Sequence, residues 1–355
     1  MKIPLFEIEW KQEDIDAISK VIKRGGYWTQ GPEVEEFEDR IAYRVGTKYA
    51  VACNSGTSAL HLALVCAGIK EGDEVIVPSF TFISTVNSIK FVGAKPVFAD
   101  IENRTCGLNI GDVKKKITKK TKAIIVVHYG GCPAFYTEEL KEFAKKHDIF
   151  LIEDSAASLG AHISGNKTGT FGDFGILSFC QNKIITTGEG GMVVTNSEEN
   201  YEKLKLICSH GQKGSNYTTL GYNFRMSSIN ASLGLSQLNR LDDIIYKRRE
   251  IAKRYLYDLK NVKKLVCPPW FYNVYWVFQV RTDKETKKPM MEYLAKNKIA
   301  TKSYYIPVHL TDYYLNGNRL PVTEEIYNTS FCLPIYPTLT YEQVSYIIDT
   351  VNNYR

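Results

Sequence analysis

The stretch Phe150-Leu151-Ile152-Glu153-Asp154-Ser155-Ala156 decides the fold class, because an apolar run ends abruptly in two carboxylates. An apolar run without polar alternation is typical of a strand that is buried on both faces of a parallel sheet. Such sheets bind ligands at the carboxyl ends of their strands, where Glu153 and Asp154 fall. A carboxylate there could bind a metal, act as a base or pair with a protonated ring nitrogen, and one of the two could simply cap the next helix.

Similar runs occur on both sides of this stretch, separated by helical patterns at residues 81–91 and 137–147. Together with the run at 149–152, which overlaps this stretch, the strand candidates are residues 74–78, 96–99, 123–127, 175–179 and 192–195. Strands that alternate with helices predict a mostly parallel sheet covered by helices on both faces, with right-handed crossovers. The first two-thirds of the chain is therefore expected to form a large α/β domain.

The pattern changes around residues 238–257, where apolar residues at helical spacing predict one long, charged amphipathic helix. Beyond it we expect a strand at 274–280, a charged helix near 288–298 and a last helix at 341–354. This order favours a smaller α+β domain. We predict a large domain at residues 1–245 and a small C-terminal domain at residues 246–355.

Composition and charge exclude several classes of protein. The chain has 355 residues and a formal charge of +6, with 45 basic residues set against 39 acidic ones. The basic run at residues 114–122 lacks interleaved aromatics, so a solvated helix end is preferred to a nucleic-acid site. The eight cysteines contain no C-x-x-C pair, which predicts neither a metal site nor a dense disulfide framework. No apolar stretch is long enough to span a membrane, and we expect a cytoplasmic protein.

A candidate phosphate site lies in Ser55-Gly56-Thr57, which leads directly into an apolar helical run. The free N–H groups and positive dipole at a helix N-terminus can hold a phosphate, although an ordinary N-cap would have the same sequence. The chain has no G-x-x-x-x-G-K-[ST] motif, and no G-x-G-x-x-G opens a βαβ unit. Nucleoside triphosphates and dinucleotides are therefore disfavoured as cofactors.

A candidate nucleophile lies in the segment that runs from Ser178 through Lys183 to Gly191. A strand ends there, a lysine follows, and a glycine-rich turn leads to the next strand. A lysine beside tight turns at a strand end can be partly desolvated, which lowers its pKa and makes its amine nucleophilic.

Together these segments resemble the DegT/DnrJ/StrS family of nucleotide-sugar aminotransferases, a branch of the fold type I pyridoxal-phosphate enzymes. The resemblance covers essentially the whole chain. It is carried further by residues 31–38, 73–82, 221–226, 305–310 and 333–337. It implies a fold type I aminotransferase, with a large domain whose mostly parallel sheet lies between helices and a smaller C-terminal domain.

The resemblance also implies roles for individual residues. Lys183 looks like the lysine that binds pyridoxal 5'-phosphate covalently, and Asp154 looks like the aspartate paired with its ring nitrogen. The remaining matches are Gly56, Thr57 and Ser178 at the cofactor phosphate, Phe82 stacked on the ring, and Asn223, which reaches the phosphate of a neighbouring subunit. A homodimer with shared active sites is therefore expected, without a metal.

The implied reaction is transamination of a nucleotide-linked keto sugar. L-Glutamate would convert the cofactor to pyridoxamine 5'-phosphate, and a 4-keto-6-deoxy sugar would then receive the amine for surface polysaccharide or glycan biosynthesis. Amination at C3 and the identity of the nucleotide (UDP, dTDP or GDP) stay open. Tyr305 and His309 fall where the family's second domain faces the substrate, and residues 28–30 lie in a loop that could cover it. Core packing explains Tyr305 and Trp28 equally well.

Two departures from the family pattern and three alternatives accompany this interpretation. Ala157 stands where many members have a polar residue near the cofactor's phenolic oxygen, and residues 128–131 form the shorter variant of a family segment.

A sugar 3-dehydratase, which has histidine in place of the lysine, is disfavoured by Lys183. A desulfurase would need a mobile thiol in glycine-rich surroundings, which Cys267 and Cys332 lack. A non-enzymatic sensor or regulator is the remaining alternative.

Overall fold

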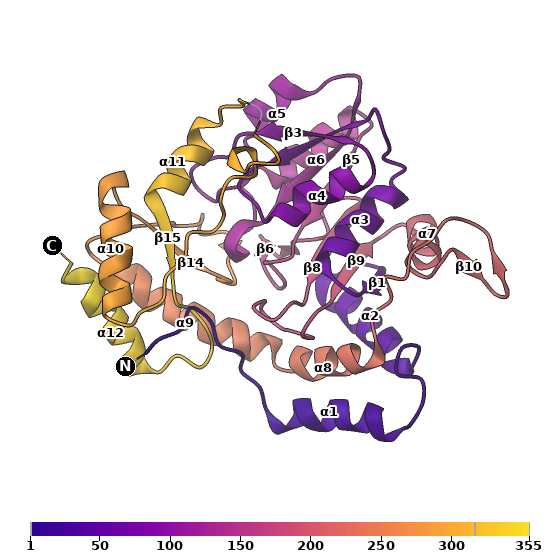
Figure 1. The fold of residues 1–355 in the computed structure, drawn as a ribbon, viewed down its shortest axis with the longest axis horizontal. Helices are drawn as coiled ribbons and strands as arrows, with labels where there is room; N and C mark the ends of the chain where they lie inside the picture. The colour runs from indigo at the N-terminus through magenta and orange to yellow at the C-terminus, as the bar shows by residue number, and fades with distance from the viewer. Residues whose placement is uncertain (1, 316, 355) are drawn as a thin grey trace.

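The computed structural model describes residues 2–315 and 317–354, and its centre is a seven-stranded sheet in the order β1-β9-β8-β5-β4-β2-β3 (Figure 1). The strands are β1 (Tyr49–Cys53), β2 (Glu74–Pro78), β3 (Lys95–Ala99), β4 (Thr121–Val127), β5 (Phe150–Asp154), β8 (Phe174–Ser178) and β9 (Gly191–Thr195). Strand β9 runs antiparallel to both of its neighbours, and the other adjacent pairs are parallel. The predicted α/β fold with a mostly parallel sheet is confirmed.

Helices cover both faces of this sheet, which explains why its strands lack polar alternation. Along β4, Ala123 and Ile125 pack into one core cluster, whereas Ile124 and Val126 pack into another on the opposite face. The helices of this part are α1 (Gln12–Lys23), α2 (Pro32–Val45), α3 (Gly56–Cys66), α4 (Ile83–Phe91), α5 (Ile110–Lys116), α6 (Thr137–Lys146), α7 (Glu198–Cys208) and α8 (Ser228–Leu238).

The remaining elements form the C-terminal part and several short connections. A three-stranded sheet, β12-β14-β15, is covered by helices, and a separate apolar core fills the space between them. The elements are β12 (Lys263–Lys264), β14 (Phe278–Arg281), β15 (Ser330–Leu333), α9 (Leu241–Asp258), α10 (Lys284–Lys296), α11 (Pro321–Thr329) and α12 (Tyr341–Asn352). The short elements are β6 (His162–Ile163), β7 (Asn166–Lys167), β10 (Gln212–Lys213), β11 (Asn216–Tyr217), β13 (Phe271–Tyr272), η1 (Tyr129–Gly131) and η2 (Val308–Leu310).

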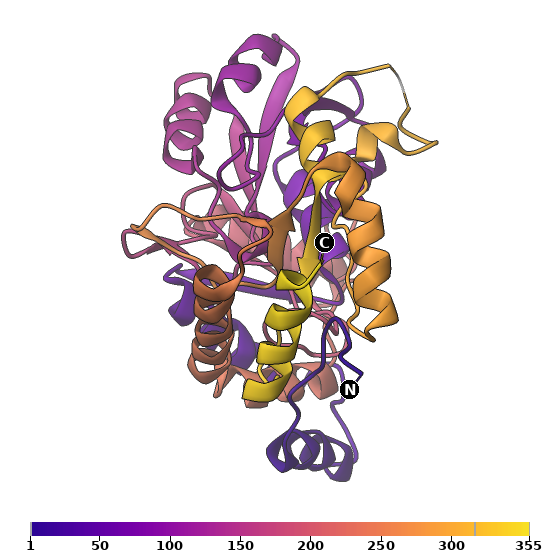
Figure 2. The ribbon, with the colours of Figure 1, turned by 90° about the vertical axis from the view of Figure 1, so that its left-hand side faces the viewer.

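The N-terminal segment joins the C-terminal core. Both views place the beginning of the chain beside the C-terminal helices (Figures 1 and 2), and Ile3 pairs with Ile299 and is buried. The division of the chain at residues 245 and 246 stays a prediction. Ile3 belongs by its packing to the second core, on the other side of that division.

Two predicted elements differ from the observed ones for identifiable reasons. The long helix predicted over 238–257 is observed as α9 (Leu241–Asp258), which begins three residues later because a separate helix, α8, ends at Leu238. Arg240 lies at the junction, where its side chain pairs with Asp14 at 2.8 Å. The strand predicted over 274–280 is shortened to β14, because the amides of Val274 and Val277 donate to the turn of η1 instead of to a neighbouring strand.

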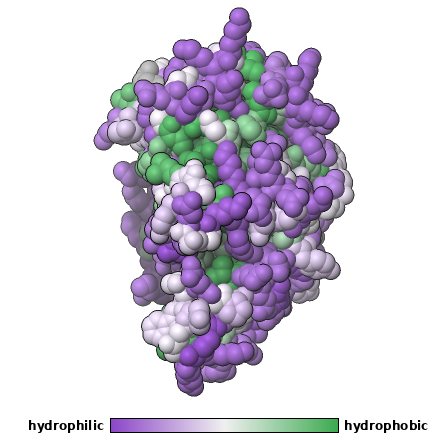
Figure 3. Space-filling model, turned by 90° about the vertical axis from the view of Figure 1, so that its right-hand side faces the viewer, coloured by the Kyte–Doolittle hydropathy of each residue, from purple (hydrophilic) through white to green (hydrophobic). Residues whose placement is uncertain are grey.

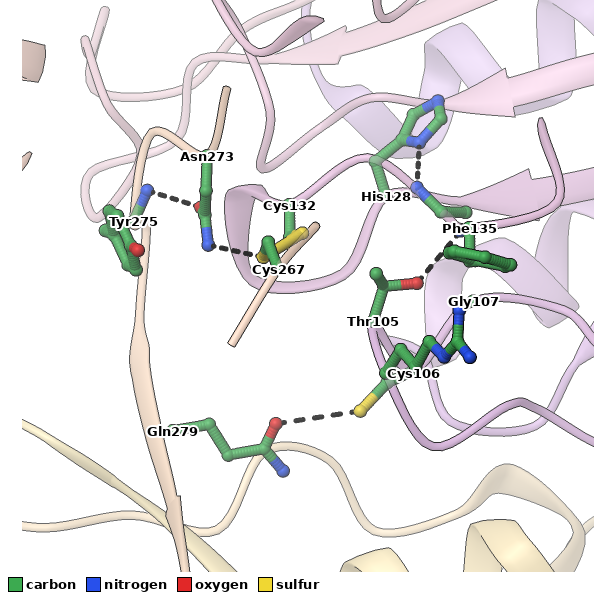
Figure 4. Close-up of a disulfide and its surroundings, with 12 residues drawn as sticks. Thr105, Cys106, Gly107, His128, Cys132, Phe135, Cys267, Asn273, Tyr275 and Gln279 are labelled. Atoms are coloured by element: carbon green, nitrogen blue, oxygen red, sulfur yellow. Dashed lines mark hydrogen bonds between the residues drawn. A yellow bond between two sulfur atoms is a disulfide. The ribbon is translucent and has the colours of Figure 1, made fainter. Parts of the chain in front are cut away.

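A disulfide joins Cys132 to Cys267 and fixes the end of this turn to the loop before β13 (Figure 4). The Asn273 side-chain amide donates to the Cys267 sulfur at 3.3 Å. The other six cysteines are free, and all of them except Cys180 are buried. This pair was not predicted, since its members are separated by 135 residues.

A buried carboxylate organises the loops at the end of β5. Glu153 is fully buried and accepts hydrogen bonds from the amides of Gly169, Phe171 and Gly172 at 2.6–2.8 Å. It also lies 2.9 Å from Nε2 of His128, whose Nδ1 accepts from the Ala134 amide. Because Nδ1 is an acceptor, Nε2 carries the proton and donates to Glu153. Four donors thus compensate one buried charge.

Removing this carboxylate should destabilise the fold strongly. Glu153→Ala leaves four buried donors unpaired, and we expect it to lower the free energy of unfolding by about 3–5 kcal/mol. The measurement is urea unfolding followed by circular dichroism. Glu142→Ala, on the exposed face of α6, is the matched control and should change stability by less than about 0.5 kcal/mol. Equal stability of the two variants would contradict this role of Glu153.

Candidate active site

A cavity of about 650 Å³ opens at the carboxyl ends of β2, β4, β5 and β8, and residues 302–311 contribute its opposite side. This is the place where parallel sheets bind ligands. The lining includes most of the residues assigned from the sequence, namely Gly56, Thr57, Phe82, Asp154, Ser178, Lys183 and Tyr305. Among the described residues, the lining does not include Asn223 or His309.

Asp154 is the last residue of β5, and its carboxylate is held by neighbours on two sides. Thr85 donates from its hydroxyl to Oδ2 at 2.8 Å, and the Ala156 amide donates to Oδ1 at 3.2 Å. Since the Thr85 hydroxyl donates to Asp154, Thr81 must donate to Thr85 across their 2.8 Å contact. Each carboxylate oxygen can accept more than one hydrogen bond, so Asp154 can also pair with a protonated ring nitrogen in the cavity.

Lys183 lies in the turn that follows β8, where its amide donates to the Cys180 carbonyl at 3.1 Å. Its amine lies 4.3 Å from the centre of the Trp276 ring. Burial lowers the pKa of this amine, while the Cys180 thiol and the Asp154 carboxylate raise it less strongly. A lowered pKa increases the neutral fraction at neutral pH, and the neutral amine is the form that attacks a carbonyl carbon.

The N-terminus of α3 forms a cradle beside the end of β8. The Ser55 hydroxyl caps the helix by accepting from the Ser58 amide at 3.1 Å, while Gly56 and Thr57 line the cavity. A Cβ atom at Gly56 would lie 2.9 Å from Cβ of Ser178, closer than real contacts allow, so only glycine lets these segments approach. Backbone N–H groups at a helix N-terminus together with the Ser178 hydroxyl can hold a phosphate.

Two aromatic residues face the open part of the cavity. Phe82 is 56% exposed, and its ring centre lies 5.9 Å from that of Tyr305. Burial, together with the negative charge of Asp154, raises the pKa of Tyr305 well above its ordinary value. The phenol therefore stays protonated at neutral pH and can donate a hydrogen bond. An exposed ring such as Phe82 can stack on a flat ligand.

The two predicted residues outside the cavity occupy different surroundings. His309 is buried, its Nδ1 lies 2.6 Å from the Ser79 hydroxyl, and its amide donates to the same hydroxyl. It therefore fastens residues 308–311 to the end of β2. Asn223 is exposed, and its carbonyl accepts from the Asn54 side chain at 3.4 Å. Trp28, in the loop expected to cover the site, is 46% exposed, and its carbonyl accepts from the Ser228 amide.

Trp276 and Lys302 are among the lining residues that the sequence did not single out. Lys302 precedes the matched segment 305–310 by three residues, which is a weak local signal. Trp276 lies 93 positions after Lys183 in an apparent strand, so only the folded chain reveals their contact. Ala157 also lines the cavity, and its methyl group cannot supply the polar contact that many family members have at this position.

The groups around the cavity fit a ligand of one particular kind. The cradle of Gly56, Thr57 and Ser178 suits a phosphate, and the buried carboxylate of Asp154 suits a basic ring nitrogen. The amine of Lys183 suits a carbonyl carbon that it can attack. Among residues 2–315 and 317–354, no cluster of His, Cys, Asp and Glu could hold a metal ion. In the same residues, no helix is both long and apolar enough to cross a bilayer.

Comparison with known proteins identifies the family in which this site occurs. The DegT/DnrJ/EryC1/StrS aminotransferase family matches residues 9–352. The GDP-perosamine synthase of Escherichia coli O157:H7 is 37% identical over 361 residues, covering 99% of this chain and 98% of its own.

Solved structures agree over almost the whole chain. DesV of S. venezuelae superposes with a TM-score of 0.94 at 33% identity, covering 99% of this chain and 98% of its own. Spr1654 of Streptococcus pneumoniae, in its PMP form, has a TM-score of 0.93 at 30% identity, with 99% and 97% coverage. The expected pyridoxal-phosphate dependence and aminotransferase fold are thereby confirmed. The chain belongs to the DegT/DnrJ/EryC1/StrS aminotransferase family.

Proposed function

We propose that this enzyme transfers the amino group of L-glutamate to a nucleotide-linked 4-keto-6-deoxy sugar, with Lys183 as the lysine that binds the cofactor. The observation that carries the proposal is the convergence of Lys183, Asp154 and the Gly56 cradle on one cavity. Relatives named GDP-perosamine synthase favour a sugar substrate of this class. A product used in polysaccharide or glycan biosynthesis and a cytoplasmic location complete the proposal.

Each residue then has a task that follows from its surroundings. When bound, pyridoxal phosphate supplies a ring that accepts electrons from the carbon whose proton is removed. Asp154 keeps a proton on the ring nitrogen, and Thr85 holds that carboxylate in place. The amine of Lys183, when it is not bonded to the cofactor, would accept the proton of the substrate carbon and deliver it to the carbon on the other side of the transferred nitrogen. The neutral fraction of its amine is increased by burial.

The anionic part of the substrate has one obvious partner. The lysines that line the cavity are Lys183 and Lys302, and only Lys302 lies on the exposed side. Its amine lies 5.0 Å from the centre of the Tyr304 ring, at the start of residues 302–311. We place the nucleotide diphosphate beside Lys302 and the sugar between Phe82 and Tyr305. The nucleotide itself and amination at C3 stay open.

A second copy of the chain is part of the proposal. The Asn223 side chain is exposed and lies outside the cavity lining of its own chain, so it is free to meet another subunit. The nearby β10–β11 hairpin projects from the molecule (Figure 1). The face on this side is mostly hydrophilic, with apolar patches between the polar ones (Figure 3). We propose a homodimer in which each Asn223 approaches the phosphate cradle of the partner.

Spectroscopy of the two half-reactions tests the proposed function. The visible band of the holoenzyme should disappear with L-glutamate and return with a GDP-, dTDP- or UDP-linked 4-keto-6-deoxy sugar. Return of the band only with a 3-keto sugar would favour amination at C3. A band that L-glutamate leaves unchanged would contradict the proposed donor.

The assignment of Lys183 has a separate test. In Lys183→Ala, borohydride should no longer fix the cofactor to the chain, and turnover should fall by about 10²–10⁴-fold or more, because the proton carrier is lost. Mass spectrometry of the reduced protein and a coupled assay measure the two effects. Lys146→Ala, at the exposed end of α6, is the control and should behave as wild type. Covalent fixation that survives in Lys183→Ala would refute the assignment.

The role of Lys302 can be separated from catalysis. Lys302→Ala should raise the KM for the nucleotide sugar about tenfold, because one charged hydrogen bond to phosphate is lost. The half-reaction with L-glutamate should stay unchanged, since glutamate carries no phosphate. Lys302→Arg keeps the charge and should retain most of the affinity. A similar loss in both half-reactions would argue against contact with the diphosphate.

A further inference from the structure

Trp276 makes two contacts with the turn that carries Lys183. The Lys183 amine lies over the Trp276 ring, 4.3 Å from its centre. The indole N–H donates to the carbonyl of Asn182 at 2.6 Å. The Trp276 side chain therefore contacts both the Lys183 amine and the peptide group between Asn182 and Lys183. Trp276 is 5% exposed, so these contacts are shielded from water.

The backbone at Trp276 is held by Arg248, and its ring packs against Tyr305. Nη1 of the buried Arg248 lies 2.9–3.3 Å from the carbonyls of Tyr275, Trp276 and Ile335. Burial lowers the pKa of Arg248 to about 10, so the guanidinium remains charged at neutral pH. The Trp276 ring also stacks on that of Tyr305, with centres 6.4 Å apart at an angle of 20°. The ring is thus fixed between α9 and residues 302–311 before any ligand binds.

The Lys183 amine needs a partner in the part of the cycle when it is not bonded to the cofactor. Burial disfavours its charged form, whereas the electron-rich face of an indole stabilises an ammonium group. Besides His128, which is bound to Glu153, and Tyr129, whose hydroxyl donates to the Tyr304 carbonyl, the other titratable side chains of the cavity are Asp154, Cys180, Glu189, Lys302, Tyr304 and Tyr305. The amine must be neutral to attack and charged after taking a proton, so both forms have to be accessible.

We propose that Trp276 is a positioning residue for Lys183. Its ring face holds the free amine and favours the state that carries the transferred proton, and its N–H fixes the backbone of the lysine turn. The proposal rests on the proposed function, since it takes Lys183 as the cofactor lysine. It extends that function by giving the C-terminal part of the chain a share in the proton transfer.

The first test measures the pKa of the Lys183 amine in the cofactor-free protein. Competitive acetylation with acetic anhydride at increasing pH, followed by mass spectrometry of the Lys183 peptide, needs neither cofactor nor substrate. Trp276→Leu should lower this pKa by about one unit, because the ring no longer stabilises the ammonium. At a pH below the pKa, this corresponds to a tenfold larger neutral fraction. Trp276→Phe should lower it less. Trp270→Phe, with an exposed tryptophan, is the control.

The second test isolates positioning from titration. Covalent capture of pyridoxal phosphate by the cofactor-free protein is followed at a pH above the amine pKa of every variant, where all the amines are neutral. Trp276→Phe keeps a ring but cannot donate to Asn182, and capture should slow by about three- to tenfold. Circular dichroism and thermal melting establish that each variant is folded.

The outcomes separate the two proposals. An unchanged amine pKa in folded Trp276→Leu would overturn the role of the ring, and unchanged capture in Trp276→Phe would overturn that of the N–H. If Trp276→Leu does not fold, the Phe variant decides both points, since its weaker ring must still shift the pKa. Failure of wild-type protein to capture the cofactor at Lys183 would instead refute the proposed function, without affecting the acetylation result.

Discussion

A carboxylate that is buried at the end of a strand needs hydrogen-bond donors around it, and the donors of Glu153 position several segments of the site. Three of its donors lie in residues 169–172, and the fourth is His128, which follows β4. The turn after His128 accepts the amides of Val274 and Val277 at Gly131 and Gly130. The same turn is tied by the disulfide at Cys132. Glu153 does not line the cavity, yet it helps to position Trp276 through this series of contacts.

The neighbouring acid, Asp154, has different surroundings from Glu153 because of strand geometry. Successive side chains of a strand point to opposite faces, so two adjacent carboxylates cannot share one environment. Glu153 is enclosed by backbone amides, whereas Asp154 faces the cavity and keeps acceptor capacity beyond Thr85 and Ala156. The apolar run alone did not distinguish the two acids, and the family resemblance assigned the ring-nitrogen role to Asp154. The structure fits that proposal, because Asp154 lines the cavity and Glu153 does not.

Local patterns in the sequence predicted elements whose contacts are local or repetitive. Strand β2 has the bounds expected from its apolar run, because a strand covered on both faces must be apolar throughout. The edge strand β1 was not predicted, and the contact of Arg240 with Asp14 just before α9 joins residues that are 226 positions apart. Lys183 was proposed as the cofactor lysine from its place after a strand in a glycine-rich segment and from the family resemblance. Trp276 and the buried position of His309 depend on contacts with distant segments, which no local pattern encodes.

Under the proposed function, substrate recognition and proton transfer are coupled in this molecule through the rings of Tyr305 and Trp276. Tyr305 faces Phe82 on the open side of the cavity and stacks on Trp276 on the other, so its ring lies between the space proposed for the sugar and the indole that contacts Lys183. A change that reshapes residues 302–311 to admit another sugar displaces Tyr305, and Trp276 can follow only by giving up its contacts with Arg248 and Asn182. Close-packed side chains of this kind move together or not at all. Replacing only the exposed side chain of Lys302 escapes that constraint, because an exposed side chain can change while the backbone of residues 302–311 and the ring stack stay in place.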